Sequence, residues 1–238
     1  MKSVYVLQHT ESEFLGRIED HLEGRGIRFT YFRPFVAGGA LPATVEFTDG
    51  LILLGGGPWG TAGGRDLPTL QEELRLVWLC LERRIPVVGI GLGAQILALA
   101  AGGRSEKTPL IFEVGAARRV TDDALNGFLP ETFPLAVYMR DRPVPPDDAS
   151  ILAVDEAGHP AVFQIGVNCL GFTGHPGAKA AMVEDLLMEF EDAPEDPLPA
   201  LEALRAAQPD IEDALVRIMT GLIGVTGMMR PATVPDPK

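Results

Sequence analysis

The segment Gly89–Gln95 has the glycine-rich composition and the neighbours of a turn that presents a catalytic nucleophile. It reads Gly-Ile-Gly-Leu-Gly-Ala-Gln and lies between a buried, strand-like run at Pro86–Ile90 and a helical run that begins near Ala94. A nucleophile elbow has this arrangement, with a strained residue held at a helix N-terminus beside backbone amides. The central residue here is Gly91, so the segment provides the turn without a nucleophilic side chain.

A second glycine-rich loop, Gly55, Gly56 and Gly57, follows another buried apolar run at Leu51–Leu54. It lacks the Gly-Lys-Ser/Thr ending of a P-loop and the GxGxxG order of a dinucleotide site, so we expect no nucleotide cofactor there. Trp59 follows this loop. It is placed either to cover the mouth of a pocket or to pack as a half-buried structural residue.

His175 is the histidine best placed for chemistry, because Gly171–Pro176 (Gly-Phe-Thr-Gly-His-Pro) follows a strand-like run. It is either a pocket residue that binds or moves protons, or a histidine packed at a strand end. His9 and His159 are isolated, and no Cys/His spacing is typical of a metal site. We therefore predict no metal.

The chain has two cysteines, Cys80 and Cys169, and both lie in apolar segments, so we expect buried thiols in a reducing compartment. The net charge of −13, from 33 acidic and 20 basic residues, opposes binding to nucleic acid or to an anionic membrane. The N-terminal run has no signal-peptide pattern, and no stretch approaches twenty apolar residues. We expect a cytoplasmic protein with no nucleic-acid or membrane partner.

Strand-like and helical runs alternate over the first 103 residues, which predicts a doubly wound α/β fold with a mostly parallel central sheet flanked by helices. The expected strands are Val4–Leu7, Ile27–Phe32, Leu51–Leu54 and Pro86–Ile90. The expected helices carry Phe14–Leu22, Thr69–Arg83 and Ala94–Ala101. Both glycine-rich loops then fall at the carboxyl edge of the sheet.

Residues 108–165 contain short β-like runs broken by Pro and Asp, which predict a small antiparallel extension. Three further helices are expected at Ala178–Phe190, Leu201–Ala207 and Asp210–Ile223, the last with Asp210 as its N-cap. We divide the chain into a domain over residues 1–192, a C-terminal helical appendage over 193–230 and a flexible tail over 231–238. The appendage is expected to pack on the domain or on a partner subunit.

These features together resemble the class I glutamine amidotransferase family. The elbow is similar to the family's G-I-C-L-G-x-Q signature, with Gly91 in place of cysteine. Gly171–Gly177 is similar to its G-x-Q-x-H-P-E, with His175 retained and Gly177 in place of glutamate. The matches run in the family's order over most of residues 1–190. The resemblance implies a flavodoxin-like fold, no cofactor, and a ligand pocket formed by Gly55, Gly56, Gly57, Trp59, Gly91, Leu92, Gln95 and His175.

In this family, the cysteine thiolate attacks the side-chain amide of glutamine and the histidine shuttles protons. Loss of a triad nucleophile costs about a million-fold in rate, so the resemblance implies no Cys-dependent glutaminase activity. A ligand-binding or regulatory subunit that serves a partner enzyme and binds a small molecule is one interpretation. An enzyme with altered hydrolase or lyase chemistry, using His175 and the oxyanion loop, is another.

A third interpretation is a structural or assembly protein that dimerises through its C-terminal helices. The end of the chain carries an apolar series, Leu222, Ile223, Val225, Met228 and Met229. Such a series suits a dimer interface, although docking onto its own domain is the alternative. We expect a homodimer.

Overall fold

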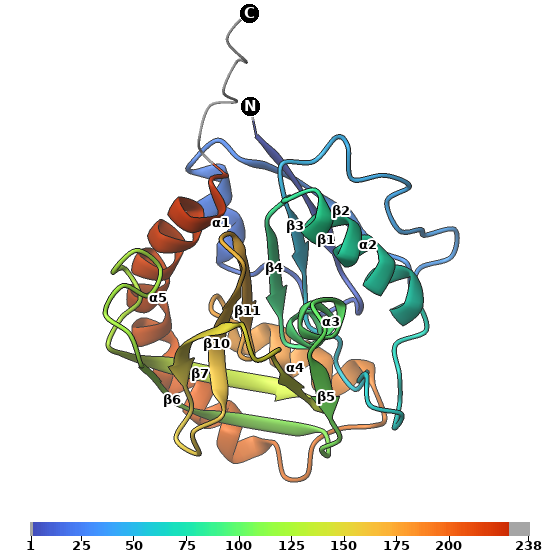
Figure 1. Cartoon of the computed structure of the whole chain (residues 1–238). Helices are drawn as coiled ribbons and strands as arrows, with labels where there is room; N and C mark the ends of the chain where they lie inside the picture. The colour runs from blue at the N-terminus through green and yellow to red at the C-terminus, as the bar shows by residue number, and fades with distance from the viewer. Residues whose placement is uncertain (1, 229–238) are drawn as a thin grey trace, which may run out of the picture.

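A computed structural model describes residues 2–228, which form one central sheet covered by helices on both faces (Figure 1). Its parallel strands are β1 (Ser3–Leu7), β2 (Arg28–Phe32), β3 (Leu51–Leu53), β4 (Val87–Ile90) and β11 (Cys169–Phe172). Its antiparallel strands are β6 (Ile111–Arg119), β7 (Thr132–Met139), β9 (Ser150–Val154) and β10 (Pro160–Ile165). The order across the sheet is β2-β1-β3-β4-β11-β10-β9-β6-β7. The predicted doubly wound, mostly parallel α/β fold is confirmed.

Helices α2 (Leu70–Glu82) and α3 (Leu92–Ala100) cover one face of the parallel half, and α1 (Ile18–Glu23) and α5 (Leu198–Thr226) cover the other. Leu51 and Leu53 of β3 pack with α2 and α3, whereas Ile52 packs with α1 and α5. Successive side chains of a strand point to opposite faces, so a sheet covered on both sides requires continuous apolar strands. This is why the sequence of the buried parallel strands is apolar without interruption.

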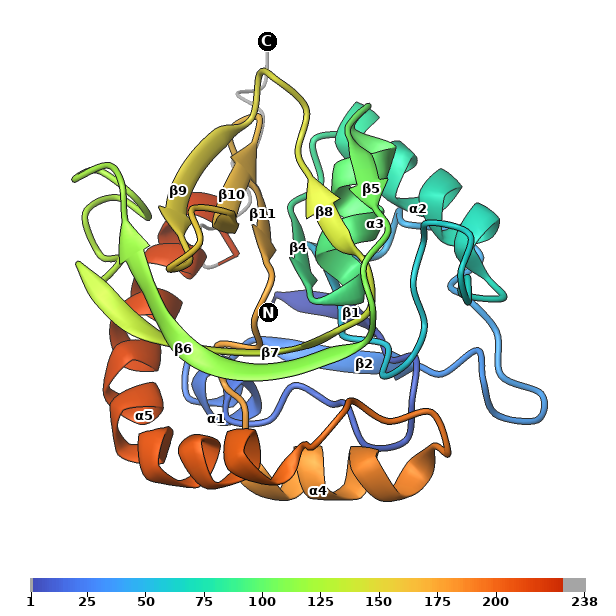
Figure 2. The same ribbon diagram turned by 90° about the horizontal axis from the view of Figure 1, so that it is seen from below.

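The antiparallel half is larger than predicted, and α4 (Ala180–Glu189) and the first part of α5 pack against its strands β6 and β7 (Figure 2). The sequence predicts only short β-like runs there, but the pairing of β6 with β7 extends from Ile111 to Arg118. Ladder hydrogen bonds use backbone groups, so polar side chains can extend a strand past its apolar run. A separate two-stranded sheet, β5 (Arg104–Glu106) with β8 (Arg142–Val144), was not predicted.

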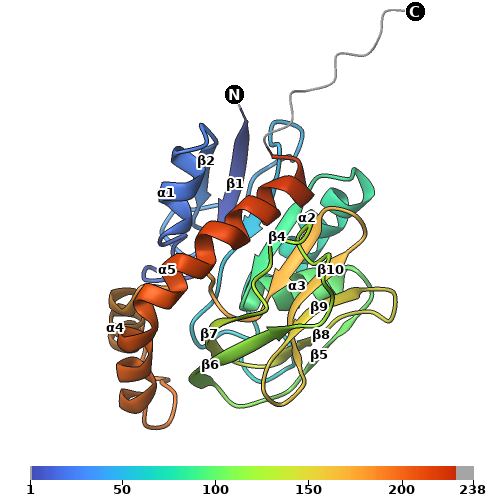
Figure 3. The same ribbon diagram turned by 90° about the vertical axis from the view of Figure 1, so that its left-hand side faces the viewer.

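The prediction of two C-terminal helices broken before Asp210 is wrong, because α5 is one helix that contains Pro209 (Figure 3). Leu204 and Ile211, on either side of the proline, are buried in one cluster with α4 and β7. A proline inside a helix costs about 3 kcal/mol. Burial of apolar side chains on both sides offsets that cost.

The apolar series near the C-terminus packs on the chain's own domain. Leu222, Ile223 and Met228 are buried in the same cluster as strands β1, β3 and β4. Met229 and the predicted tail at 231–238 lie outside the described residues. The surface that suggested dimerisation is therefore covered within the chain.

Helix α1 is shorter than predicted, because it begins at Ile18 and does not include Phe14 or Leu15. Gly16 has φ 61°, a left-handed conformation that interrupts a helix and favours glycine. A methyl group on Gly16 would lie 2.5 Å from the carbonyl oxygen of Gly177. The loop before α1 is thus packed directly against the segment that carries His175. Within residues 2–228, no helix combines the length and the apolar character needed to cross a bilayer.

Candidate functional site

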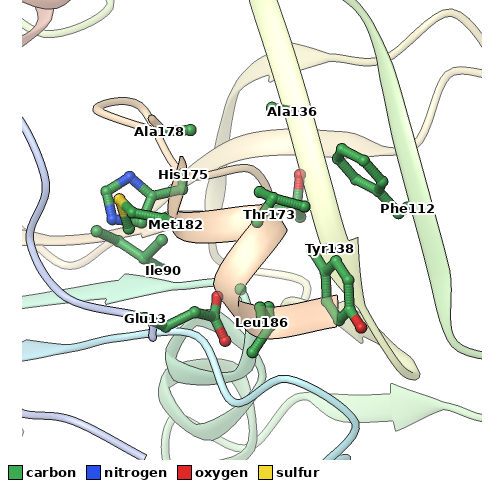
Figure 4. A pocket seen from close by; sticks show the side chains of 12 residues that line it. Glu13, Ile90, Phe112, Ala136, Tyr138, Thr173, His175, Ala178, Met182 and Leu186 are labelled. Atoms are coloured by element: carbon green, nitrogen blue, oxygen red, sulfur yellow. The ribbon is translucent and has the colours of Figure 1, made fainter. Parts of the chain in front are cut away.

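A small pocket lies at the carboxyl ends of β4 and β11, where the sequence places the elbow and His175 (Figure 4). Its volume is about 30 Å³, room for one or two water molecules. Helix α4 covers it with Met182, Val183 and Leu186. The polar side chains that line it belong to Glu13, Tyr138, Thr173 and His175.

The elbow turn is present, with Gly91 at φ 56° and ψ −114° as the N-cap of α3. This conformation costs a residue with a Cβ about 1 to 3 kcal/mol, and glycine avoids most of that cost. A methyl group at Gly91 would contact only the Cα atom of Gly55, at 3.4 Å. The backbone therefore keeps an elbow and room for a side chain, but the sequence supplies none.

His175 is held by backbone groups at both ring nitrogens. Its Nε2–H donates to the Phe14 carbonyl at 2.9 Å, and the Gly177 N–H donates to its Nδ1 at 3.1 Å. Burial lowers the pKa of His175 to about 4, against the opposing effect of the Phe14 carbonyl. A neutral imidazole with both nitrogens occupied has no free atom to accept a proton from a ligand.

Position 177 is enclosed by the start of α1. A methyl group on Gly177 would lie 3.1 Å from the Ile18 Cγ1 atom and 3.2 Å from the Ile18 backbone nitrogen. The Phe14 carbonyl contacts His175 where an orienting carboxylate would be expected. A longer side chain at 177 would have to move α1.

The Gly55–Gly57 loop is occupied by Glu13, a residue that the sequence analysis did not identify. The Gly57 N–H donates to Glu13 Oε2 at 2.6 Å, and a methyl group on Gly55 would lie 1.9 Å from Glu13 Oε1. The Glu13 carboxyl group therefore lies against the loop that would hold an oxyanion. Gly55 lies close to both this carboxyl group and Gly91, and Glu13 and Gly91 line the same pocket.

Glu13 is buried, and burial raises its pKa to about 7, although the Gly57 N–H and the positive charge of His9 act in the opposite direction. Its protonated and ionised forms therefore coexist near neutral pH. A group of this kind can donate or accept a proton at little cost, which makes it the pocket's candidate acid–base residue.

Behind the loop, His9 forms a fully buried pair with Glu73 of α2. Nε2 of His9 lies 2.9 Å from Glu73 Oε2, and Nδ1–H donates to the Leu54 and Gly55 carbonyls at 3.1 and 3.0 Å. Burial acts to lower the pKa of His9, but the Glu73 carboxylate outweighs it and the pKa is raised. The protonated ring thus links α2 to the backbone of the Gly loop.

Tyr138 places a second polar group at the pocket. Its hydroxyl is buried and has no hydrogen-bond partner among residues 2–228. Burial raises its pKa, and the nearby carboxylates of Glu13 and Asp192 raise it further. An unpaired buried hydroxyl costs about 1 to 3 kcal/mol, which a small polar molecule in the cavity would recover.

Of the residues predicted to line the pocket, the structure places Gly91 and His175 there and the others around it. Gly56 and Leu92 pack against each other, since a methyl group on Gly56 would lie 2.2 Å from Leu92 Cδ2. Gln95 is buried; it accepts from the Thr61 hydroxyl at 2.7 Å and donates to the Arg140 carbonyl at 2.6 Å.

Trp59 is half-buried and does not fill the pocket. The Arg65 guanidinium stacks on its ring, 4.8 Å from the centroid. The residues that fill the space instead are Glu13 and those of α4. Trp59 therefore lies beside the Gly loop at the rim of the site.

Neither cysteine lies at the elbow. Cys80 is a buried residue of α2, and Cys169 is the first residue of β11, the strand whose other end leads to His175. Burial raises the pKa of Cys80 to about 12 and that of Cys169 to about 11, so both remain protonated at neutral pH. Nor do three metal-ligating side chains gather anywhere in residues 2–228.

The sequence contains a signal around Glu13, but it indicates a helix start. Thr10 and Glu13 have the spacing of a capping box, and the Glu13 N–H does donate to Thr10 Oγ1 at 3.1 Å. The Glu13 side chain turns instead to the Gly57 amide. The local capping-box pattern does not predict this long-range contact between Glu13 and Gly57.

Comparison with known proteins gives consistent results. The family model Glutamine amidotransferase class-I matches residues 14–168, a range that includes the elbow and ends before His175. The carbamoyl phosphate synthase small chain of Stutzerimonas stutzeri is 31% identical over 165 residues, 64% of this chain and 41% of that protein. This chain thus spans less than half the length of that relative.

Two solved structures have the same fold. A glutamine amidotransferase from Methylobacillus flagellatus has a TM-score of 0.79 at 22% identity, covering 94% of this chain and 95% of the other. One from Thermotoga maritima has a TM-score of 0.78 at 21% identity, covering 97% and 99%.

Proposed function

Since this chain belongs to the class-I glutamine amidotransferase family, we propose that it is a ligand-binding or regulatory subunit that does not hydrolyse glutamine by cysteine chemistry. The observation that carries this proposal is the elbow, where Gly91 keeps the strained turn but no thiol is present. The two thiols are buried elsewhere, and both nitrogens of His175 bind backbone groups. The site therefore has no thiol nucleophile, and His175 has no free nitrogen with which to activate one.

A partner enzyme is part of the proposal. The relative from Stutzerimonas stutzeri is named as the small chain of a synthase, which is a subunit. A pocket that binds without turnover would act through such a partner in the cytoplasm, where two unpaired thiols remain reduced. Dimerisation through the C-terminal apolar series is not proposed, because Leu222, Ile223 and Met228 pack on the chain's own sheet.

The test is ammonia release from glutamine by the purified protein, beside a Cys80→Ala/Cys169→Ala variant and a His175→Ala variant. We expect all three to remain at the rate without protein. Ammonia release that scales with protein concentration and disappears in the Cys80→Ala/Cys169→Ala variant would show a relocated nucleophile. Release that disappears only with His175→Ala would show that this histidine retains a catalytic role.

A second candidate function, altered hydrolase or lyase chemistry, is favoured by one observation. Glu13 has a pKa near 7 and lies against the Gly loop beside Gly91. A water molecule in the pocket would give this carboxyl group a partner for proton transfer. Glu13, rather than His175, would then be the acid–base residue. Hydrolysis of a carbonyl compound that Glu13→Gln abolishes and His175→Gln retains would favour this candidate; loss in both variants would exclude it.

A further inference from the structure

A strap, residues 190–197, leaves α4 and runs past the Gly loop before α5 begins. At the end of α4, Glu189 accepts hydrogen bonds from the backbone N–H groups of Glu11 and Ser12, at 2.9 and 3.0 Å. The Phe190 ring packs on the loop, since a methyl group on Gly57 would lie 3.0 Å from it. The strap is thus held beside the elbow pocket by a few defined contacts.

Two arginines converge on one oxygen atom of this strap. Arg65 Nη1 and Arg140 Nη2 each lie 2.8 Å from Asp192 Oδ2. One carboxylate neutralises only one of the two positive charges in this contact. A doubly charged anion would match the pair better.

Both guanidinium groups have supports other than Asp192. Arg140 Nε donates to the Pro58 carbonyl at 2.8 Å. Arg65 stacks on Trp59, 4.8 Å from the ring centroid. Arginines fixed by such contacts are preorganised for carboxylate or phosphate, and they would stay in place if Asp192 left.

We propose that Arg65 and Arg140 form a binding site for an anionic group of the ligand, a carboxylate or a phosphate, and that Asp192 occupies this site when no ligand is bound. The proposal deepens the ligand-binding part of the proposed function and rests on it. The ligand's anionic group replaces Asp192, and its remaining part extends along Trp59 toward the pocket of Glu13 and Tyr138. Release of Asp192 frees the strap and removes one contact that holds α4 over the pocket.

The experiment is calorimetric titration of the full chain and an Asp192→Asn variant with two probes, inorganic phosphate and glutarate, at constant ionic strength. We expect Asp192→Asn to bind at least one probe tenfold or more tightly, because the internal competitor is gone. The two probes distinguish a phosphate site from a carboxylate site. Adding Arg65→Gln or Arg140→Gln to Asp192→Asn should return the affinity to the parent value or below.

The matched control is Glu184→Gln, which removes a carboxylate of α4 that pairs with Arg205 of α5 and not with Arg65 or Arg140. It should leave both affinities unchanged. A Trp78→Phe background leaves Trp59 as the only tryptophan, and its emission should change on binding, since Arg65 stacks on it. Equal affinities of Asp192→Asn and parent for both probes, or tight binding that persists without Arg65, would overturn the proposal. Neither result depends on ammonia release, so the two proposals fail separately.

Discussion

The two sides of the Gly55–Gly57 loop differ in the ionisable side chains that they carry. On the elbow side, Gly91 and Gly177 have no side chains and His175 is neutral and held by the backbone. On the other side, three ionisable side chains are buried: His9 and Glu13 bind the backbone of the loop, and Glu73 pairs with His9.

Buried charges are costly, so a fold retains them only where paired groups stabilise them. The elbow side keeps a backbone conformation that has no evident use without a nucleophile. The ionisable group now free to act in this pocket is therefore Glu13, from the segment after β1, with His9 and Glu73 supporting the loop behind it, while the elbow contributes shape.

The largest stability effect is expected on the side of the loop that carries His9, Glu13 and Glu73, called the charged side below. His9→Leu leaves Glu73 buried without its partner, which should lower the free energy of unfolding by about 3 to 5 kcal/mol. His9→Leu/Glu73→Leu should cost clearly less than His9→Leu. Denaturant unfolding measures both. His159→Ala, which breaks a partly exposed pair with Asp155, is the control and should cost less than about 1 kcal/mol. A double variant as unstable as the single one would mean that His9 stabilises by packing alone.

The next effect is a pH dependence due to Glu13, whose pKa is about 7 in the folded protein against 4.5 for the unperturbed group. The folded protein binds more protons between these values, so this group's stability contribution is present below pH 4.5 and is lost as pH rises to about 7. At about 1.4 kcal/mol per pKa unit, the loss is on the order of 3 kcal/mol. Glu13→Gln should remove it.

Unfolding free energies of the native protein and Glu13→Gln at pH 5 and pH 8 measure this effect. The variant should gain on the native protein at pH 8. Glu11→Gln, two residues earlier and exposed, should follow the native protein at both values. Parallel behaviour of Glu13→Gln and the native protein would remove Glu13 from the account of the charged side.

The smallest effect is expected at the elbow. Gly91→Ala adds one ordinary contact, with the Cα atom of Gly55, but a strained φ, so it should cost about 1 to 3 kcal/mol. Gly26→Ala, at φ 67° with no atom within 4 Å, is the control for a positive φ alone. Gly93→Ala would place its methyl group 2.3 Å from the Leu53 carbonyl oxygen and should cost more than either. If thermal unfolding ranked Gly91→Ala with Gly93→Ala, the elbow would be closed to side chains.

The sequence predicts the parallel half of the fold because its strands are buried on both faces and end in glycine turns. It also places Gly91 and His175 in one pocket, since the carboxyl ends of β4 and β11 share an edge. It does not predict α5 as one helix, because local rules assign a break to Pro209 while packing on both sides holds the helix together.

The charged side of the site is not predictable from local patterns. His9 and Glu73 lie 64 residues apart, and Glu13 and Gly57 lie 44 apart. Each pair exists only because β1, β3 and α2 meet. An isolated histidine and a glutamate with capping-box spacing have ordinary local interpretations, so their roles appear only in the fold.

The most direct test of the account is ammonia release from glutamine by a Gly91→Cys variant, with the new thiol quantified by alkylation in a Cys80→Ala/Cys169→Ala background. We expect a thiol that can be alkylated but no glutamine hydrolysis, because His175 is neutral and both of its ring nitrogens already bind Phe14 and Gly177. Hydrolysis restored by this single substitution would contradict it, since the elbow side would then lack nothing but the thiol.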